Sequence, residues 1–148
     1  MAEVHFETNL NATRNEIDPI NDGLYEYNAS KLAADIPREY FRFTVSVKDD
    51  AGKVVGGVVA EGYWDWLHVE TLWLSEAYRG QDIGTRLLIE AEDIARDKGL
   101  HHAQLETTSF QALGFYQKHG YTIFGTLDNK PPGVTWYYLR KDLYQLVK

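Results

Sequence analysis

The first 40 residues carry two periodic patterns that predict one strand and one helix. Apolar and polar residues alternate over residues 3–9, which is typical of a half-buried strand. Asp18 followed by Pro19 is a helix-start signal, because aspartate can cap a helix and proline fits its first turn. We expect this helix to run toward Ala34, with Pro37 as the interruption.

Three apolar runs separated by short turns follow. Residues 40–48 place apolar side chains on one face, residues 53–63 are rich in valine and glycine, and residues 66–74 form the third run. Residues 49–52 read Asp-Asp-Ala-Gly, a composition that favours a hairpin turn, and Asp65 marks the next turn. The economical interpretation is a meander of three strands.

Beyond residue 80 the apolar spacing changes to that of a helix. Apolar residues recur at three- and four-residue spacing from Ile83 to Ala95, and Gly99 is placed to end the helix. The remaining elements alternate: a strand over residues 102–108, a short helix over 111–119, and strands over 121–127 and 134–140. Together the patterns predict one α/β domain over residues 1–148. We expect a mixed, mostly antiparallel sheet of about seven strands flanked by helices.

The charge balance narrows the class of partner. The 148 residues include 15 lysines and arginines against 22 aspartates and glutamates, a net charge of −7. Binding nucleic acid requires a basic face to neutralise phosphates, and the basic residues here form no such cluster. We therefore expect no nucleic-acid partner, whereas cations and amines are attracted to an acidic protein.

Several chemistries are excluded by what the sequence lacks. It has no cysteine, which removes disulfides, thiolate metal sites and cysteine nucleophiles. The histidines show no metal-ligand spacing, so we expect no metal. The N-terminal segment has no apolar core of the kind that a signal peptide contains. No apolar run approaches the roughly 18 residues of a membrane span, and we expect a cytoplasmic protein without a membrane partner.

The connection between the third run and the main helix has the layout of a phosphate site. Residues 78–85 read Tyr-Arg-Gly-Gln-Asp-Ile-Gly-Thr, and the helix that follows would present unpaired N–H groups at the positive end of its dipole. Gly80 and Gly84 allow close approach of a ligand, and Arg79 adds a fixed positive charge. The loop matches neither a Walker loop nor a dinucleotide fingerprint, and taken alone it is equally a simple turn.

Two motifs resemble one known family. Residues 72–88 read Leu-Trp-Leu-Ser-Glu-Ala-Tyr-Arg-Gly-Gln-Asp-Ile-Gly-Thr-Arg-Leu-Leu, and residues 111–121 read Gln-Ala-Leu-Gly-Phe-Tyr-Gln-Lys-His-Gly-Tyr. The first is similar to the signature that opens the main helix of the GNAT superfamily, the acyl-coenzyme A-dependent N-acetyltransferases. The second is similar to that family's alanine, Phe-Tyr and glycine-aromatic element. Shorter segments further resemble a branch of small bacterial-type members related to histone acetyltransferases: residues 56–57, 73–75, 106–107 and 110–112.

The resemblance implies acetyl-coenzyme A as cosubstrate and a sheet splayed between its fourth and fifth strands. Leu72, Trp73 and Leu74 would pair with the pantetheine arm in the manner of an added strand. Ser109 stands where the family often has an asparagine, and its hydroxyl can still bond to the cofactor. The loop that would cradle the pyrophosphate comprises Arg79, Gly80, Gln81, Asp82, Ile83, Gly84 and Thr85.

Asp82 departs from the family pattern, which has its first glycine at this position. We interpret Asp82 as the cap of the helix that begins at Ile83. Its carboxylate would nevertheless lie near the pyrophosphate, where repulsion is of order 1 kcal/mol. We therefore expect Asp82 to weaken coenzyme A binding.

The family's reaction is direct attack of an amine on the thioester, which needs a base and an acid. Tyr116 matches the family's general-acid position, with a core tyrosine as the alternative. His68 and Glu70 are base candidates, because residues two apart on a strand share a face. Both could equally be solvated strand residues. Glu106, on the next strand, is a third candidate.

The leading hypothesis is transfer of an acetyl group from acetyl-coenzyme A to a primary amine of a small molecule, such as an amino sugar, an antibiotic-like compound or a polyamine. Aromatic residues could line its acceptor pocket or belong to the core and hairpins: Tyr63, Trp64, Trp66 and Trp73. The alternatives are a protein or peptide N-acetyltransferase and a coenzyme A-binding module without efficient catalysis. The sequence leaves the oligomeric state open, a homodimer included.

Overall fold

The computed structural model describes residues 2–36 and 39–144. The chain divides into two compact units, residues 1–36 and residues 37–148, and each is described by itself. Pro37, the predicted interruption, lies outside the described residues.

The N-terminal unit contains one helix, α1 (Arg14–Lys31), and no strand over residues 3–9. The strand prediction is wrong because, in the described part of the chain, residues 3–9 are exposed and no strand pairs with them. The helix begins earlier than predicted. Thr13 caps it, with its hydroxyl accepting from Asn15 N–H at 3.3 Å and its own N–H donating to Glu16 at 2.7 Å. This capping box outweighs the Asp18 signal and leaves Pro19 inside the helix.

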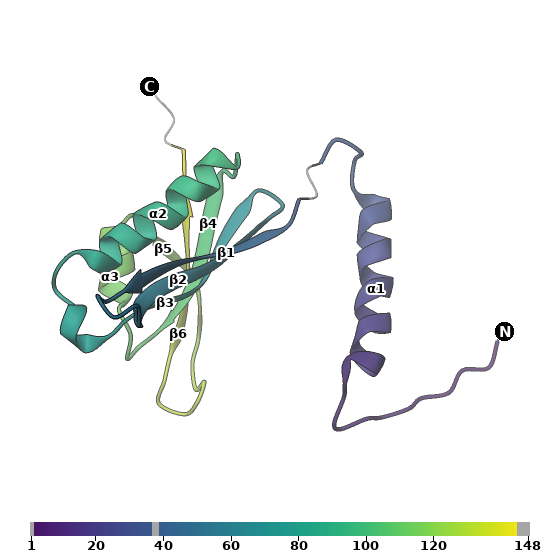
Figure 1. The fold of residues 1–148 in the computed structure, drawn as a ribbon. Coiled ribbons are helices and arrows are strands. Elements are labelled where there is room, and N and C mark those ends of the chain that lie inside the picture. The colour runs from purple at the N-terminus through teal and green to yellow at the C-terminus, as the bar shows by residue number, and fades with distance from the viewer. Residues whose placement is uncertain (1, 37–38, 145–148) are drawn as a thin grey trace. The chain divides into compact units, whose positions relative to one another are not determined.

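The second unit is built on six strands in the order β1-β2-β3-β4-β6-β5 (Figure 1). All neighbours are antiparallel except β3 and β4, which are parallel. The predicted mixed sheet is therefore confirmed, with six strands in place of seven because the N-terminal strand is absent from the described residues. The strands are β1 (Phe41–Lys48), β2 (Val54–Tyr63), β3 (Trp66–Leu74), β4 (His102–Thr108), β5 (Thr122–Leu127) and β6 (Trp136–Asp142).

Helix α2 (Ile83–Asp97) packs its apolar stripe on the sheet, as its period predicts. Leu88 and Ala91 are fully buried with Leu67 and Val69 of β3. A short 3-10 turn (Glu76–Tyr78) leads into α2, and α3 (Leu113–Lys118) follows β4. Both helices contribute side chains to the same core.

The turns between β1, β2 and β3 form where their composition predicts. Asp49 accepts hydrogen bonds at Oδ1 from Ala51 N–H and Lys53 N–H, both at 2.9 Å. Trp64 and Asp65 both have positive φ, the conformation of the tight hairpin turn between β2 and β3. The meander of three strands is therefore confirmed.

β3 separates from β4 halfway along its length. The two strands pair from Trp66 with His102 to Val69 with Leu105, and no further pair follows in the described residues. At the same point the register between β2 and β3 shifts, so that Glu70 has no partner on β2. The half of β3 beyond this bulge therefore leaves its β4-facing edge unpaired, which is the splay that the family resemblance implies.

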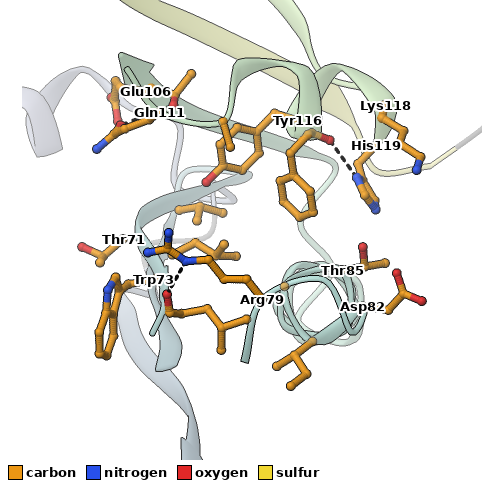
Figure 2. A pocket seen from close by; sticks show the side chains of 18 of the residues that line it. Thr71, Trp73, Arg79, Asp82, Thr85, Glu106, Gln111, Tyr116, Lys118 and His119 are labelled. Carbon is orange, nitrogen blue, oxygen red and sulfur yellow. Dashed lines mark hydrogen bonds between the residues drawn. The ribbon is translucent and has the colours of Figure 1, made fainter. Parts of the chain in front are cut away.

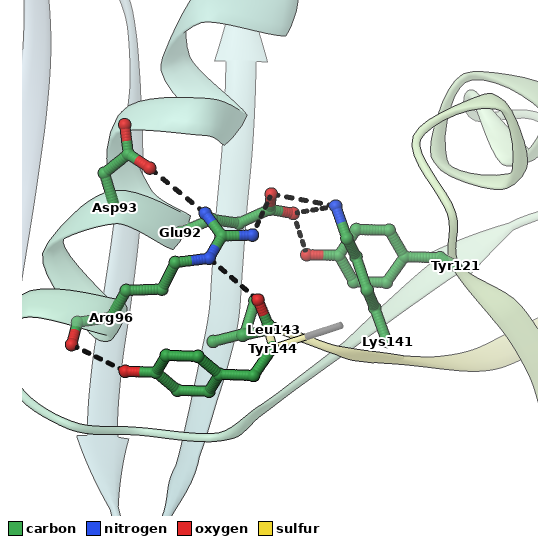
Figure 3. Close-up of polar contacts among 7 residues, drawn as sticks. All are labelled: Glu92, Asp93, Arg96, Tyr121, Lys141, Leu143 and Tyr144. Carbon is green, nitrogen blue, oxygen red and sulfur yellow. Dashed lines mark hydrogen bonds and ion pairs between the residues drawn. The ribbon is translucent and has the colours of Figure 1, made fainter. Parts of the chain in front are cut away.

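A buried ion-pair cluster connects α2 to β6 and to Tyr121, the residue before β5 (Figure 3). Glu92 of α2 is 3% exposed and accepts from the Tyr121 hydroxyl at 2.7 Å and from Lys141 Nζ at 2.9 Å. Arg96 lies 3.9 Å from the same carboxylate. Burial and the Glu92 charge raise the pKa of Tyr121, so its hydroxyl remains a donor. A carboxylate this deeply buried is tolerated only because these donors compensate its lost hydration.

We expect Tyr121→Phe to lower the free energy of unfolding by about 2 kcal/mol, because it removes a hydrogen bond to a buried charged group. Urea denaturation measures the change. The matched control is Tyr144→Phe, whose exposed hydroxyl donates to the Arg96 carbonyl at 3.0 Å and whose loss should cost under about 0.5 kcal/mol. Equal losses in both variants would show that the cluster is not stabilising.

Candidate functional site

A cavity of about 860 Å³ occupies the splay between β3 and β4 (Figure 2). Its walls come from the second half of β3, the loop before α2, the end of β4 and one face of α3. Segments that are far apart in the sequence therefore line one space. Most of the predicted site residues contribute to its lining: Glu70, Leu72, Trp73, Leu74, Arg79, Gly80, Asp82, Ile83, Gly84, Thr85 and Tyr116.

Three predicted site residues do not line this cavity. The Ser109 hydroxyl accepts from the Thr135 N–H at 3.2 Å, so it is engaged with the strand connection that follows β5. Gln81 is exposed and is not among the lining residues. His68 lies in the first, paired half of β3 and lines a second cavity of about 260 Å³.

The loop before α2 presents a run of unpaired backbone donors. Gly80 and Asp82 have φ values of +77° and +62°, which turn the backbone in toward the helix start. Across the described residues, the N–H groups of residues 80–85 donate to no carbonyl or side chain. They include the first-turn amides of a 15-residue helix, which point toward the positive end of the helix dipole. Such an arrangement binds anions.

Asp82 stands at the N-cap of α2 but does not cap it with its side chain. No cap hydrogen bond forms, and only the backbone carbonyl accepts, from Arg86 N–H at 3.0 Å. The prediction of a capping carboxylate is therefore wrong. The physical reason is the left-handed backbone at Asp82, since a capping side chain requires an extended N-cap conformation. Aspartate is among the few side chains that tolerate the positive φ for which glycine is the usual choice.

Arg79 is held against β3 by its own side chain. Its Nε donates to the Leu74 carbonyl at 3.0 Å, as the dashed line in Figure 2 marks. The guanidinium thus stays beside the unpaired edge of β3 and contributes positive charge to the cavity.

Tyr116 extends into the cavity from α3, on the wall opposite Arg79 (Figure 2). Tyr116 is only 8% exposed, and this burial raises the pKa of its phenol. Among the described residues its hydroxyl takes part in no hydrogen bond. A protonated hydroxyl that borders the cavity without a partner is available to donate to a bound molecule.

The three base candidates are each engaged by another side chain, and Glu106 lines the large cavity together with Glu70. The Glu70 carboxylate accepts from Arg42 Nε at 2.8 Å. His68 Nε2 lies 2.8 Å from Glu106, and its Nδ1 lies 3.4 Å from Glu61. The hydrogen bond to Glu106, with the charges of both carboxylates, raises the pKa of His68 against the opposing effect of burial.

The predicted aromatic residues are divided between the two cavities. Tyr63, Trp64 and Trp66 line the second cavity beside His68, whereas Trp73 lines the first and is 49% exposed. Asp65 accepts from His101 N–H at 3.0 Å and so belongs to the turn before β3.

Sequence reasoning missed several residues of the cavity wall. Gln111 accepts from the Thr108 N–H at 3.2 Å and shapes the turn after β4. Lys118 and His119 lie at the end of α3, across the cavity from Asp82 and Thr85 (Figure 2). Their signal was present in the second family motif, which ends Gln-Lys-His-Gly-Tyr, but the motif alone assigns them no role. The remaining unpredicted wall residues are Val69, Thr71, Thr107, Phe110, Ala112 and Phe115.

Within residues 2–36 and 39–144, no group of three or more histidines and carboxylates is arranged to hold a metal ion. None of the described helices combines the length and apolar character that crossing a membrane requires.

Comparison with known proteins agrees with this geometry. The acetyltransferase (GNAT) family model matches residues 10–121. Blasticidin-S acetyltransferase of Streptomyces morookaense is 42% identical over 95 residues, which is 64% of this chain and 70% of that protein. An acetyltransferase of Bacillus cereus has a structure similar to this one with a TM-score of 0.86, at 35% identity over 94% of this chain and 97% of its own. Nourseothricin acetyltransferase gives a TM-score of 0.62 at 27% identity, covering 77% of this chain and 71% of its own.

The family match spans well over half of the chain and takes in both motifs as well as α1. The cavity, the anion-binding loop and the splayed strand described above belong to the matched segment. The chain therefore belongs to the GNAT family and is an acyl-coenzyme A-dependent acetyltransferase.

Proposed function

We propose that residues 1–148 act as one N-acetyltransferase domain that transfers the acetyl group of acetyl-coenzyme A directly to a primary amine of a small molecule. The observation that carries this proposal is the composition of one cavity. It combines an unpaired strand edge, a run of free amides and a buried tyrosine hydroxyl.

The residues of the cavity fit acetyl-coenzyme A, the cosubstrate that this family uses. The free amides of residues 80–85 and Arg79 match a pyrophosphate. The edge of β3 from Leu72 to Leu74 matches the amides of an extended pantetheine arm. When bound, acetyl-coenzyme A supplies a thioester carbonyl that an amine can attack.

Tyr116 and the backbone of β3 supply the remaining chemistry. A backbone N–H of the splayed strand stabilises the negative charge that develops on the carbonyl oxygen during attack. The Tyr116 hydroxyl donates its proton to the departing sulfur, and its raised pKa ensures that this proton is present at neutral pH. The incoming amine must first lose a proton, because an alkylamine is mostly charged at neutral pH.

A small-molecule acceptor is supported by the names of two relatives, which state blasticidin S and nourseothricin as their substrates. The net charge of −7 supports a cationic acceptor. A coenzyme A-binding module without efficient catalysis is the second candidate, and Asp82 favours it because its carboxylate lines the cavity near the anion-binding loop.

Thiol release and thermal shift together test these candidates. We expect acetyl-coenzyme A to raise the melting temperature, and we expect thiol release with at least one member of a panel that includes blasticidin S, nourseothricin, aminoglycosides, polyamines and peptides. Stabilisation without thiol release would support the binding module. Release with peptides alone would support a peptide acetyltransferase, and no stabilisation at all would contradict the proposal.

We expect Tyr116→Phe to lower kcat by about 10²-fold, because the departing sulfur loses its proton donor. The Kd for coenzyme A should change by less than about twofold, since the phenyl ring still fills the same space. Steady-state thiol release and isothermal titration measure the two quantities. Tyr144→Phe, an exposed and distant variant, is the control. Wild-type turnover in Tyr116→Phe would remove this residue from the mechanism.

We expect Asp82→Asn to tighten coenzyme A binding about fivefold, which corresponds to roughly 1 kcal/mol of removed repulsion. Asparagine keeps the size of the side chain and also tolerates the positive φ, so the variant isolates the charge. Asp97→Asn, at the exposed opposite end of α2, makes the same change in net charge and should leave the Kd unchanged. Equal affinities in Asp82→Asn and the wild type would show that the carboxylate points away from the cofactor.

A further inference from the structure

A row of four hydrogen-bonded side chains crosses the sheet from the main cavity, and it is here named the proton row. It consists of Glu106 on β4, His68 on β3, Glu61 on β2 and Tyr40 just before β1. His68 Nε2 lies 2.8 and 3.1 Å from the two Glu106 oxygens. His68 Nδ1 lies 3.4 Å from Glu61 Oε1, and the Tyr40 hydroxyl donates to Glu61 Oε2 at 2.7 Å.

Glu106 stands at the inner end of the row, where the sheet opens. The last residue of β4 that pairs with β3 is Leu105, so Glu106 is the first residue past the point of separation. It lines the large cavity, while its partner His68 lines the second cavity. The proton row is therefore the connection between the two spaces.

The outer end of the proton row reaches solvent. The side chains of Glu106, His68 and Glu61 are 28%, 27% and 29% exposed, so the inner members are partly shielded from water. Tyr40, at the outer end, is 55% exposed. A proton that enters at Glu106 thus has a path of polar atoms to solvent.

The partner of Glu106 distinguishes it from Glu70, which also lines the cavity. Glu70 accepts from Arg42 at 2.8 Å, and a guanidinium cannot take up a proton, whereas the imidazole of His68 beside Glu106 can. Arg42 is near Glu61 as well and stabilises its charge. On the β6 side, Tyr138 is the register partner of Glu106, and Arg140 lies 5.0 Å over the ring of Trp66.

We propose that Glu106 is the catalytic base that takes a proton from the acceptor's ammonium group and that His68 and Glu61 pass this proton to solvent. The inference rests on the proposed acetylation of an amine. Glu106 is assigned to contact the acceptor, and His68 and Glu61 act through it as positioning and relay residues.

The proton balance of this step is complete. One N–H bond of the ammonium breaks as an O–H bond forms on Glu106. The acceptor is neutral His68 with its single proton on Nδ1, so that Nε2 is free. The O–H bond on Glu106 breaks as the proton moves to this Nε2. The imidazolium then releases a proton through Glu61 to water. The second proton that nitrogen loses goes to the departing sulfur through Tyr116.

The row predicts the direction of the pH dependence. His68 must be neutral to receive a proton, so activity falls as the pH drops through the pKa of His68. Because Glu106 and Glu61 raise that pKa, the acidic limb of kcat/KM should lie above the ordinary histidine value of about 6.5. Glu61→Gln removes one of the two raising groups, and it should shift the acidic limb to lower pH.

The central test is Glu106→Gln, assayed with the amine on which the wild type turns over fastest. We expect kcat to fall by about 10²-fold or more at pH 7, while the Kd for coenzyme A changes by less than about twofold. The residual rate should rise about tenfold for each pH unit up to the pKa of the amine, near 10, because the variant depends on amine already deprotonated in solution. Glu90→Gln, on the exposed face of α2, is the matched control and should keep wild-type activity.

Each outcome decides the inference. Wild-type turnover in Glu106→Gln overturns it, as does a loss that is equal at every pH, which is the signature of a merely structural role. A greater loss in Glu70→Gln than in Glu106→Gln would assign the base to Glu70 instead. A wild type that acetylates no amine overturns the proposed function itself, whereas an active wild type with an equally active Glu106→Gln overturns only the role of Glu106.

Discussion

The structure depends on the separation of β3 from β4 after the pair of Val69 and Leu105. Two parallel strands normally continue their ladder, because an unpaired backbone edge in the interior of a sheet forfeits its hydrogen bonds. Here the bulge at Glu70 shifts the register of β3 against β2 and turns the second half of β3 away. The forfeited hydrogen bonds are those that an extended ligand can replace, so the fold holds a binding edge open.

The same separation explains why residues from four segments line one cavity. At the closed end of the gap, β3 and β4 pair from Trp66 with His102 onward. Helix α2 covers this paired half of the sheet, and Leu88 and its neighbours form the core beneath the helix. The buried carboxylate of Glu92, with Tyr121 and Lys141, fixes α2 to β6 on the far side. Helix α2 is therefore held on both sides of the gap, and the loop before α2 lies among the residues that line it. In the proposed reaction these contacts hold the donor and the acceptor in the geometry of attack.

The sequence predicts the parts of this arrangement that arise from local order. The apolar period of α2, the turns at Asp49 and Asp65, and the succession of strands along the chain from residue 40 onward all follow from local spacing. The N-terminal prediction failed at Asp18 because the reciprocal bonds of Thr13 and Glu16 stabilise an earlier start. Asp82 was misread because its type suits a cap, whereas its backbone conformation, set by the loop, excludes one.

The polar contacts that matter most for the proposed chemistry lie beyond local pattern. Glu106 and His68 are 38 residues apart, and their contact depends on the parallel pairing of β3 with β4 and on its end point. Period-two alternation places each side chain on a face of its strand but does not say which strands are neighbours. Only the resemblance to the family carried information across that distance. Its two motifs marked Tyr116 and the loop before α2, and Glu106 stood among three base candidates without any sign of its contact with His68.

Charge is distributed in the cavity as the two proposed substrates require. The chain as a whole is acidic, yet Arg79 and the free amides of residues 80–85 make the α2 end positive, where an anionic cofactor would lie. Glu106 makes the β4 side of the gap negative, where an ammonium group would arrive. The anionic cofactor and the ammonium group would therefore approach each other at the point where β3 separates from β4. In the proposed reaction, a single break in a strand ladder accounts for the binding edge, the contact between the substrates and the path by which a proton leaves.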